Sequence, residues 1–431
     1  MNAPSRTPIT PDQTPTPSPT PSSTPSPASA PASQTIRREI RQGEFIAVTA
    51  LITAMGALAI DTILPAFGAI RTHLGLASDS TRVSLLVTAY LMGMGVGQIP
   101  AGILSDRFGR KRALLGFIAL YGIGVAATTM APSLGLMIAA RFVWGLGGAG
   151  PRAVAIAMIR DSHEGVRMAQ ILSYVQSIFV IVPVLAPTLG AVALHVGGWR
   201  ATILVPAAVA LVLVAWLSRV PETLPSERRR PASFALLRTA FGQKFRHRPT
   251  VLYAVAMAFL FGCISSYISL AESIIDELYG RKSQFPIIFG LIAATMGVTT
   301  LLNARLVGRL GLDRMLRVMP RLSALIAVGF AIVSAQTRGR PPFIVFAIGM
   351  AALLSAQTLV TPNVQTAAMS EHGHLAGLAA GILGTVATVG GAVFGTIVSQ
   401  VHDGSTRSLL FAIALFLCAA LGCITLAQRA E

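Results

Sequence analysis

The chain has 431 residues, of which 53% are hydrophobic and 12% are charged. Soluble domains carry about 25% charged residues, so a water-soluble surface of this size would lack charge. The high apolar content also excludes a disordered or collagen-like chain. The three cysteines all lie in apolar runs and offer neither a disulfide framework nor a CxxC metal site. The composition therefore predicts a polytopic membrane protein.

The chain begins with a tract rich in proline, serine and threonine. Residues 1–42 contain few large apolar side chains, so they cannot bury a core, and we expect a disordered cytoplasmic tail. A secretory signal peptide would need a basic start followed by a short apolar stretch. Neither feature is present, so no cleaved leader is expected.

Apolar stretches long enough to cross a bilayer, which takes about 20 helical residues, follow from Phe45 onward. They fall into two sets of six, in residues 43–218 and 250–431, joined by a polar cytoplasmic loop at 219–249. The predicted fold class is an all-α membrane protein with twelve transmembrane helices in two six-helix pseudo-repeats. The expected spans are 45–67, 83–104, 113–131, 134–158, 169–194, 201–218, 250–275, 285–307, 318–336, 342–362, 375–400 and 406–427.

Lysine and arginine are distributed unequally among the loops of this arrangement. If the amino terminus lies inside, the inner segments hold roughly three basic residues for each one outside, which is the bias of cytoplasmic loops. The bias supports an even number of spans, with both termini in the cytoplasm and the protein in the cell inner membrane. Nucleic-acid binding, the other use of a net charge of +17, is not expected because no aromatic-and-basic RNA motif accompanies the arginines.

A short internal repeat supports the duplication. The loop after the second span reads RFGRKRAL from Arg107, and the loop after the eighth reads RLGLDRML from Arg309. The two segments share arginine, glycine, arginine and leucine at the same spacing. Duplicated halves of this kind are found in many secondary transporters.

The loop after the second span also carries the most specific motif in the chain. Its residues GILSDRFGRK, from Gly102 to Lys111, match the signature G-x-L-x-D-R-x-G-R-[KR]. On this motif the chain resembles the major facilitator superfamily.

Two further segments narrow the resemblance to the drug:proton antiporters and, within them, to the bicyclomycin-resistance-like (Bcr/CflA) branch. In the first span, DTILPA from Asp61 resembles the D-x-x-L-P-A of that branch. In the fourth span, RFVWGLGGA from Arg141 resembles R-x-x-Q-G-x-G, with Trp144 where glutamine is usual. The resemblance covers about residues 45–427 and implies twelve spans and drug export.

The fifth span carries a partial match to a third antiporter motif. Pro183, Pro187 and Gly190 resemble the end of G-x-x-x-G-P-x-x-G-G, whose first glycines are missing here. We expect this cluster to bend the fifth span.

Asp61 and Arg141 are the predicted proton-coupling residues. A charge at mid-bilayer costs about 2.5–3.5 kcal/mol, so a carboxylate there should be paired, neutral or functional. At about 1.5 Å per residue from the predicted outer ends of their spans, both lie roughly 9–11 Å deep and can meet if spans 1 and 4 adjoin. An adjacent arginine favours the ionised form of the acid, whereas a dry pocket favours the protonated form. An acid that moved between these two environments would therefore release and take up a proton. A static structural ion pair is the alternative.

Six polar or aromatic residues within the spans are candidates for a substrate cavity. Glu272 is a candidate second acid or cation contact, and the alternative is a solvated helix end beside Asp276 and Glu277. For the glutamines, hydrogen bonding between helices is an equal alternative. The six candidates are Trp144, Gln176, Ser266, Tyr267, Glu272 and Gln357.

The resemblance also implies a conformational lock that closes the cytoplasmic side. In this lock Asp106 and Arg110 would bond to the start of the eleventh span and to the Arg160–Asp161 pair. Gly109 favours a tight turn here, whereas pure topology by positive charge is the alternative. The predicted members are Gly102, Asp106, Arg107, Gly109, Arg110, Lys111, Arg160 and Asp161.

These features together predict a proton-coupled secondary transporter that exports amphipathic small molecules or drugs by alternating access. The chain has no G-x-x-x-x-G-K-[ST] loop, so the proton gradient rather than ATP is the expected energy source. No cofactor, metal or enzymatic activity is expected, and the expected partners are a small-molecule substrate, protons and the lipid bilayer. The protein is expected to be a monomer. The alternative function is a proton-coupled uptake or exchange carrier for a small metabolite.

Overall fold

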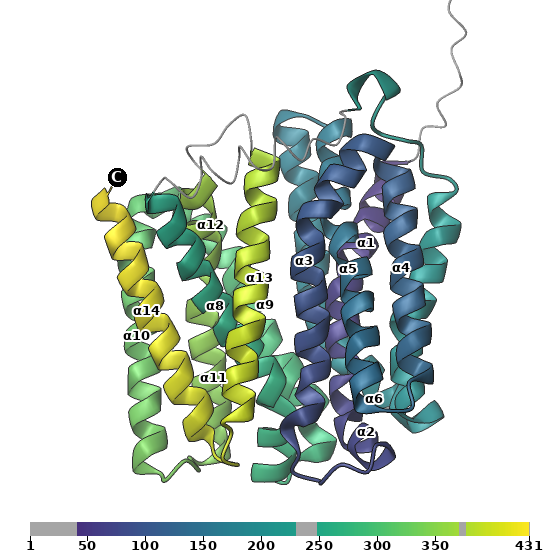
Figure 1. Ribbon diagram of the computed structural model, residues 1–431. Helices are drawn as coiled ribbons and strands as arrows, with labels where there is room; N and C mark the ends of the chain where they lie inside the picture. The colour runs from purple at the N-terminus through teal and green to yellow at the C-terminus, as the bar shows by residue number, and fades with distance from the viewer. Residues whose placement is uncertain (1–40, 230–247, 370–375, 431) are drawn as a thin grey trace, which may run out of the picture. The chain divides into compact units, whose positions relative to one another are not determined.

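A computed structural model describes residues 41–229, 248–369 and 376–430. Most of the predicted tail at 1–42 and most of the predicted middle loop at 219–249 lie outside these ranges. Every regular element in the described ranges is helical, and residues 39–431 form one compact unit. Figure 1 shows the end of α14 on the face where α1 begins, here named the terminal face, with α2 on the opposite face.

The first half contains the elements up to α6. They are α1 (Gln42–Asp61), η1 (Leu64–Ala66), α2 (Phe67–His73), η2 (Thr81–Ser84), α3 (Leu85–Phe108), α4 (Arg110–Met130), α5 (Leu134–Ser162) and α6 (Gly165–Leu217).

The second half begins at α8, after the short η3 (Ser226–Arg228). Its elements are α8 (Arg248–Ser273), η4 (Ile274–Leu278), η5 (Lys282–Gln284), α9 (Phe285–Leu310), α10 (Leu312–Gln336), α11 (Phe343–Thr358), α12 (Thr361–Met369), α13 (Ala376–Gln400) and α14 (Thr406–Ala430).

Eleven of the described segments are long and apolar enough to cross a membrane. One of them, at 170–217, has 48 residues, which at about 1.5 Å per residue is more than two bilayer crossings. This segment is interrupted by non-helical torsion angles at Gly197 and Gly198. It therefore contains the fifth and sixth spans, and the described residues contain the twelve predicted spans.

Two predicted spans are broken rather than continuous. The first span stops at the end of α1 and resumes through η1 and α2, with Pro65 at the start of η1. The tenth span stops at the end of α11 and resumes at α12, whose second residue is Pro362. Proline lacks an N–H and restricts the residue before it, so a helix breaks there although the apolar run continues.

The duplication seen in the sequence is present in the backbone. Gly109 joins α3 to α4 with φ 93° and ψ 159°, and Gly311 joins α9 to α10 with φ 77° and ψ 158°. A positive φ strains any residue with a Cβ, so glycine is required at both turns. The repeated segments thus build the same turn in each half.

Helices within each half pack closely, most extensively α3 on α5 and α8 on α13. A Cβ at Gly145 of α5 would lie 2.0 Å from the backbone oxygen of Tyr90 in α3. Only glycine allows this approach of the two backbones.

The two halves meet along α3 and α13 (Figure 1), and also along α6 and α9. Among the described side chains, three hydrogen bonds join α3 and α13. They join the Thr385 hydroxyl to the Gly95 oxygen (2.8 Å), the Gln98 amide to the Thr388 hydroxyl (3.1 Å) and the Thr396 and Thr88 hydroxyls (2.9 Å).

We expect Gly145→Val to lower the free energy of unfolding by about 1–3 kcal/mol, the usual cost of overpacking. Gly116→Val is the matched control, because a Cβ at Gly116 of α4 meets no atom within 4 Å. Thermal unfolding of both variants in detergent checks this. Equal unfolding midpoints would contradict the close α3–α5 contact.

Candidate functional site

Asp61 is the last residue of α1 and is 4% exposed. The membrane segment continues past it to His73, so Asp61 lies about 18 Å from that end at about 1.5 Å per residue. The predicted depth of about 9–11 Å was counted from a span end at residue 67, and it stays a prediction. The carboxylate thus lies deep in the bundle, at a helix break.

Arg141 of α5 is fully buried between α1 and α3. Its Nη1 donates to the carbonyl oxygen of Ala59 (3.0 Å), and its Nε donates to that of Leu86 (3.1 Å). Its guanidinium also lies over the rings of Tyr90 and Trp144, 4.9 and 4.6 Å from their centroids. Arg141 therefore stabilises the last turn of α1, where helix ends leave carbonyls free.

Asp61 and Arg141 lie in one layer, as their predicted pairing requires, because Arg141 binds the carbonyl two residues before Asp61. No ion pair joins them, however, and within the described ranges Asp61 has neither a hydrogen bond nor an ion pair. The Nη2 atom of Arg141 likewise has no partner there. The structure thus places both groups together in an unpaired state.

The fifth span meets the helix break at Gly190. A Cβ at Gly190 would lie 2.2 Å from the carbonyl oxygen of Thr62, the residue after Asp61. Helical torsion angles continue through Pro183 and Pro187, and those that depart from the helix in α6 are at Gly197 and Gly198. Gly190 therefore lets α6 approach the break, and the predicted bend at this cluster stays a prediction.

The predicted cavity residues take part in several different contacts. Trp144 is buried in the first half, where its ring packs edge-on against those of Tyr90 and Tyr121. Ser266 donates within α8 to the carbonyl of Gly262 (2.7 Å), and the Gln357 amide contacts the Leu260 carbonyl. No contact within the described ranges joins these three side chains to one another. Gln176 is partly buried in α6.

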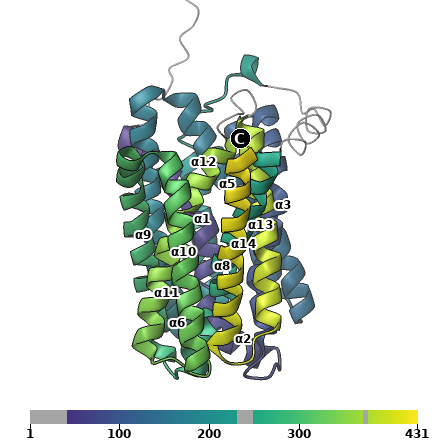
Figure 2. The ribbon, with the colours of Figure 1, turned by 90° about the vertical axis from the view of Figure 1, so that its left-hand side faces the viewer.

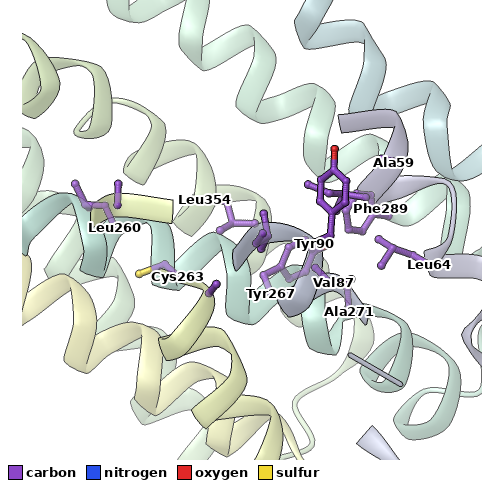
Figure 3. Close-up of a cluster of buried hydrophobic side chains, with 14 of the residues drawn as sticks. Ala59, Leu64, Val87, Tyr90, Leu260, Cys263, Tyr267, Ala271, Phe289 and Leu354 are labelled. Atoms are coloured by element: carbon purple, nitrogen blue, oxygen red, sulfur yellow. The ribbon is translucent and has the colours of Figure 1, made fainter. Parts of the chain in front are cut away.

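Tyr267 of α8 is a predicted cavity residue in an aromatic contact with α9. Its ring stacks on Phe289 of α9, with centroids 5.5 Å apart. Figure 3 shows it in an apolar cluster with Leu64 and Val87 of the first half. The buried hydroxyl of Tyr267 has no hydrogen-bond partner within the described ranges.

Glu272 forms a buried ion pair between the halves. Nη2 of Arg71 in α2 donates to both carboxylate oxygens, at 2.6 and 2.8 Å, and Nη1 lies 3.0 Å from Glu277. The Arg71 and Glu272 side chains are each 6% exposed. This burial contradicts the solvated helix end, and the role of Glu272 in a substrate cavity stays a prediction. The structure instead shows an ion pair, here named the opposite-face clamp, that joins the halves.

Arg71 was not among the predicted functional residues. The predicted first span ended at residue 67, which left Arg71 as an ordinary loop charge. The apolar run in fact continues through Ile70, which is fully buried. That continuation was the available signal that Arg71 lies within the span.

Arg110 is the centre of the predicted lock on the terminal face. Its side chain is 4% exposed, its Nε lies 2.7 Å from Asp161, and its Nη1 contacts Asp106 and the Ser105 hydroxyl. Arg110 thereby joins α3, α4 and α5 within the first half. The predicted contact with the start of the eleventh span falls on side chains outside the described residues. A Cβ at Gly102 would meet no atom within 4 Å, and the side chains of Arg107 and Arg160 are exposed.

Glu222 is a further member of this network that the sequence reasoning missed. Its carboxylate accepts from the backbone N–H groups of Arg110 (2.8 Å) and Lys111 (3.2 Å), which caps the start of α4. Lys111 in turn donates to the carbonyls of Val220 (3.0 Å) and Ser218 (3.4 Å) after α6. An acid four residues after the predicted end of the sixth span, in a stretch rich in arginine, was the available signal.

The helical arrangement and these networks define a secondary transporter built from two halves. Residues 49–395 match the family model of the Major Facilitator Superfamily, and the chain belongs to that superfamily. The match confirms the family and the fold class predicted from the sequence.

Two relatives match most of the chain. It is 26% identical over 369 residues to the bicyclomycin resistance protein homolog of Haemophilus influenzae, with 85% of this chain and 92% of the relative covered. It is 27% identical over 380 residues to the MFS-type transporter YdgK of Bacillus subtilis, with 86% and 92% covered. A shorter match, 32% identical over 172 residues, covers 38% of this chain and 44% of the multidrug resistance protein MdtL of Escherichia coli.

Solved structures share the fold at low sequence identity. A D-xylose-proton symporter superposes with a TM-score of 0.74 at 16% identity, covering 90% of this chain and 97% of the other. A bacterial homolog of the human lysosomal transporter Spinster gives 0.71 at 17% identity, with the same coverage. These likenesses show the fold alone.

We expect the opposite-face clamp to hold this face closed. Breaking a buried ion pair by changing one partner costs about 3–5 kcal/mol, so Arg71→Glu and Glu272→Arg should each open the face. The double swap restores opposite charges and should close it again. The measurement is maleimide labelling of Ser269→Cys, a site 4% exposed, after Cys263, Cys418 and Cys423 are changed to serine.

Arg82→Glu is the matched control, because Arg82 is an exposed arginine near the same face. It should leave maleimide labelling of Ser269→Cys as low as in the protein with Arg71 and Glu272 unchanged. Labelling of the double swap as strong as that of the single variants would contradict the clamp.

Proposed function

We propose that the chain is a proton-coupled exporter of amphipathic small molecules that works by alternating access across the inner membrane. The observation that carries this proposal is Asp61, a buried carboxylate with no hydrogen bond or ion pair in the described ranges. An isolated ionised carboxylate in hydrocarbon is costly, so Asp61 must be neutralised by a proton, a substrate or an arginine. This choice among partners is what a coupled transporter needs.

Arg141 is the arginine in this scheme. Its unpaired Nη2 lies in the layer of Asp61, so a small shift of α5 against α1 would bring opposite charges together. Loss of the proton would then be compensated by Arg141, and gain of a proton would release it. Each change alters the contact between α5 and the broken end of α1, which is how proton movement could drive the conformational cycle.

The loop charges support an assignment of the two faces. Basic residues are concentrated on the terminal face, which we assign to the cytoplasm together with both chain termini. The Arg110 network then lies on the cytoplasmic side, and the opposite-face clamp closes the outer side.

The direction of transport and the substrate class rest on the relatives. One relative along nearly the whole chain is a bicyclomycin resistance protein homolog, and a shorter match is to a multidrug resistance protein. These names favour export of drug-like molecules. We expect protons as the driving ion and no cofactor. A proton-coupled uptake or exchange carrier would have the same fold, and the direction of transport separates the two.

We expect the wild type to lower drug accumulation in a pump-deficient bacterial host, and a protonophore to abolish this effect. A panel of neutral and cationic drugs is the probe, because no residue here selects one compound. Asp61→Asn removes the titratable group and should accumulate drug as the empty vector does. Asp79→Asn, which changes an exposed acid, should behave as the wild type.

Raised uptake by the wild type, or no difference across the panel, would reject export and favour the metabolite carrier. Export that survives Asp61→Asn would support the exporter function. It would reject proton coupling through Asp61 and leave this acid a structural role.

A further inference from the structure

The two copies of the repeated loop differ in how their arginines are paired. In the first copy, Arg110 is paired with Asp106 and Asp161. In the second copy, Gly308 and Leu312 take the places of Asp106 and Arg110. The stretch nevertheless keeps five arginines around the turn at Gly311 and a single acid, Asp313. The arginines, here named the α9–α10 cluster, are Arg305, Arg309, Arg314, Arg317 and Arg321.

All five arginines are exposed. The hydrogen bonds of their side chains within the described ranges go to backbone oxygens, from Arg317 to Asp313 (3.3 Å) and from Arg321 to Arg317. No ion pair in the described part of the chain joins any of the five to a carboxylate. Within the described residues, the cluster is therefore a concentrated positive charge with no carboxylate partner.

The same two helices present apolar side chains next to this charge. Val318, Leu322 and Leu325 of α10 are 45%, 42% and 70% exposed, and Leu301 and Leu302 of α9 are 54% and 45% exposed. Figure 2 shows α9 and α10 on the side of the bundle that faces the viewer. Exposed leucine beside exposed arginine is the pattern expected at the boundary between hydrocarbon and lipid headgroups.

We propose that the α9–α10 cluster is a binding site for anionic phospholipid of the adjacent leaflet. The lipid phosphate contacts the arginines, whose planar guanidinium groups suit phosphate oxygens, and the acyl chains lie on the leucines. The tendency of basic loops to remain on the cytoplasmic side of the membrane explains why these arginines lie on that face. It does not explain why Arg110 in the first copy is paired with carboxylates while the arginines of the second copy have no ion pair within the described ranges. Lipid phosphate supplies the missing counter-charge in the second half.

Binding of a fluorescent phosphatidylglycerol to the purified full-length protein in zwitterionic detergent micelles tests this proposal. The wild type should bind it in preference to the matching phosphatidylcholine. Arg309→Gln, Arg314→Gln and Arg317→Gln combined should weaken phosphatidylglycerol binding on the order of 100-fold, from the known contribution of each basic residue near an anionic surface. Because these side chains are exposed, the triple variant should keep the unfolding midpoint of the wild type.

The matched control removes three charges from the opposite face, with Arg82→Gln, Arg281→Gln and Arg338→Gln. It should bind phosphatidylglycerol as the wild type does. Equal loss in the control, or no loss in the α9–α10 variant, would overturn the proposal. Competition by inorganic phosphate as strong as that by phosphatidylglycerol would also overturn it, and would point to a soluble anion instead.

Discussion

A charge inside a bilayer must be paired, neutralised or hydrated, and this constraint accounts for the polar contacts of the chain. Arg141 is neutralised in part by backbone carbonyls and aromatic rings, and Arg71 by Glu272 from the other half. Asp61 alone among these buried groups has no such partner in the described ranges. The structure therefore leaves one acid whose negative charge is not neutralised by the contacts seen here. A proton or a substrate must neutralise it.

The broken first span explains why this acid lies where it does. Ending α1 at Asp61 frees a carbonyl, that of Ala59, which Arg141 binds. Gly190 lets α6 lie against the same break. Discontinuous helices near the middle of the membrane are a recurring place for binding and coupling in secondary transporters. One proline at position 65 thus connects the local backbone to the proposed coupling step.

Much of the fold could be predicted from the sequence. Apolar runs and loop charges were sufficient for the twelve spans, and the repeated glycine turns at Gly109 and Gly311 have matching torsion angles. The pairing of Arg110 with Asp106 and Asp161 followed from a local motif. These features depend on residues close in sequence or on a specific signature.

The parts that could not be predicted depend on tertiary contacts. The clamp joins Arg71 to Glu272 across 201 residues, and nothing in either segment indicates the other. Glu222 contacts the start of α4 from 112 residues further along the chain. Counting apolar residues also could not locate the break after Asp61, because a proline redirects a helix without changing hydropathy.

Proton release on drug binding tests the central claim most directly. Purified protein in weakly buffered detergent would be mixed with a drug that it exports, and a pH indicator would report released protons. We predict release from the wild type and none from Asp61→Asn under conditions in which both bind the drug. Equal release from both proteins, or none from the wild type, would contradict coupling through Asp61.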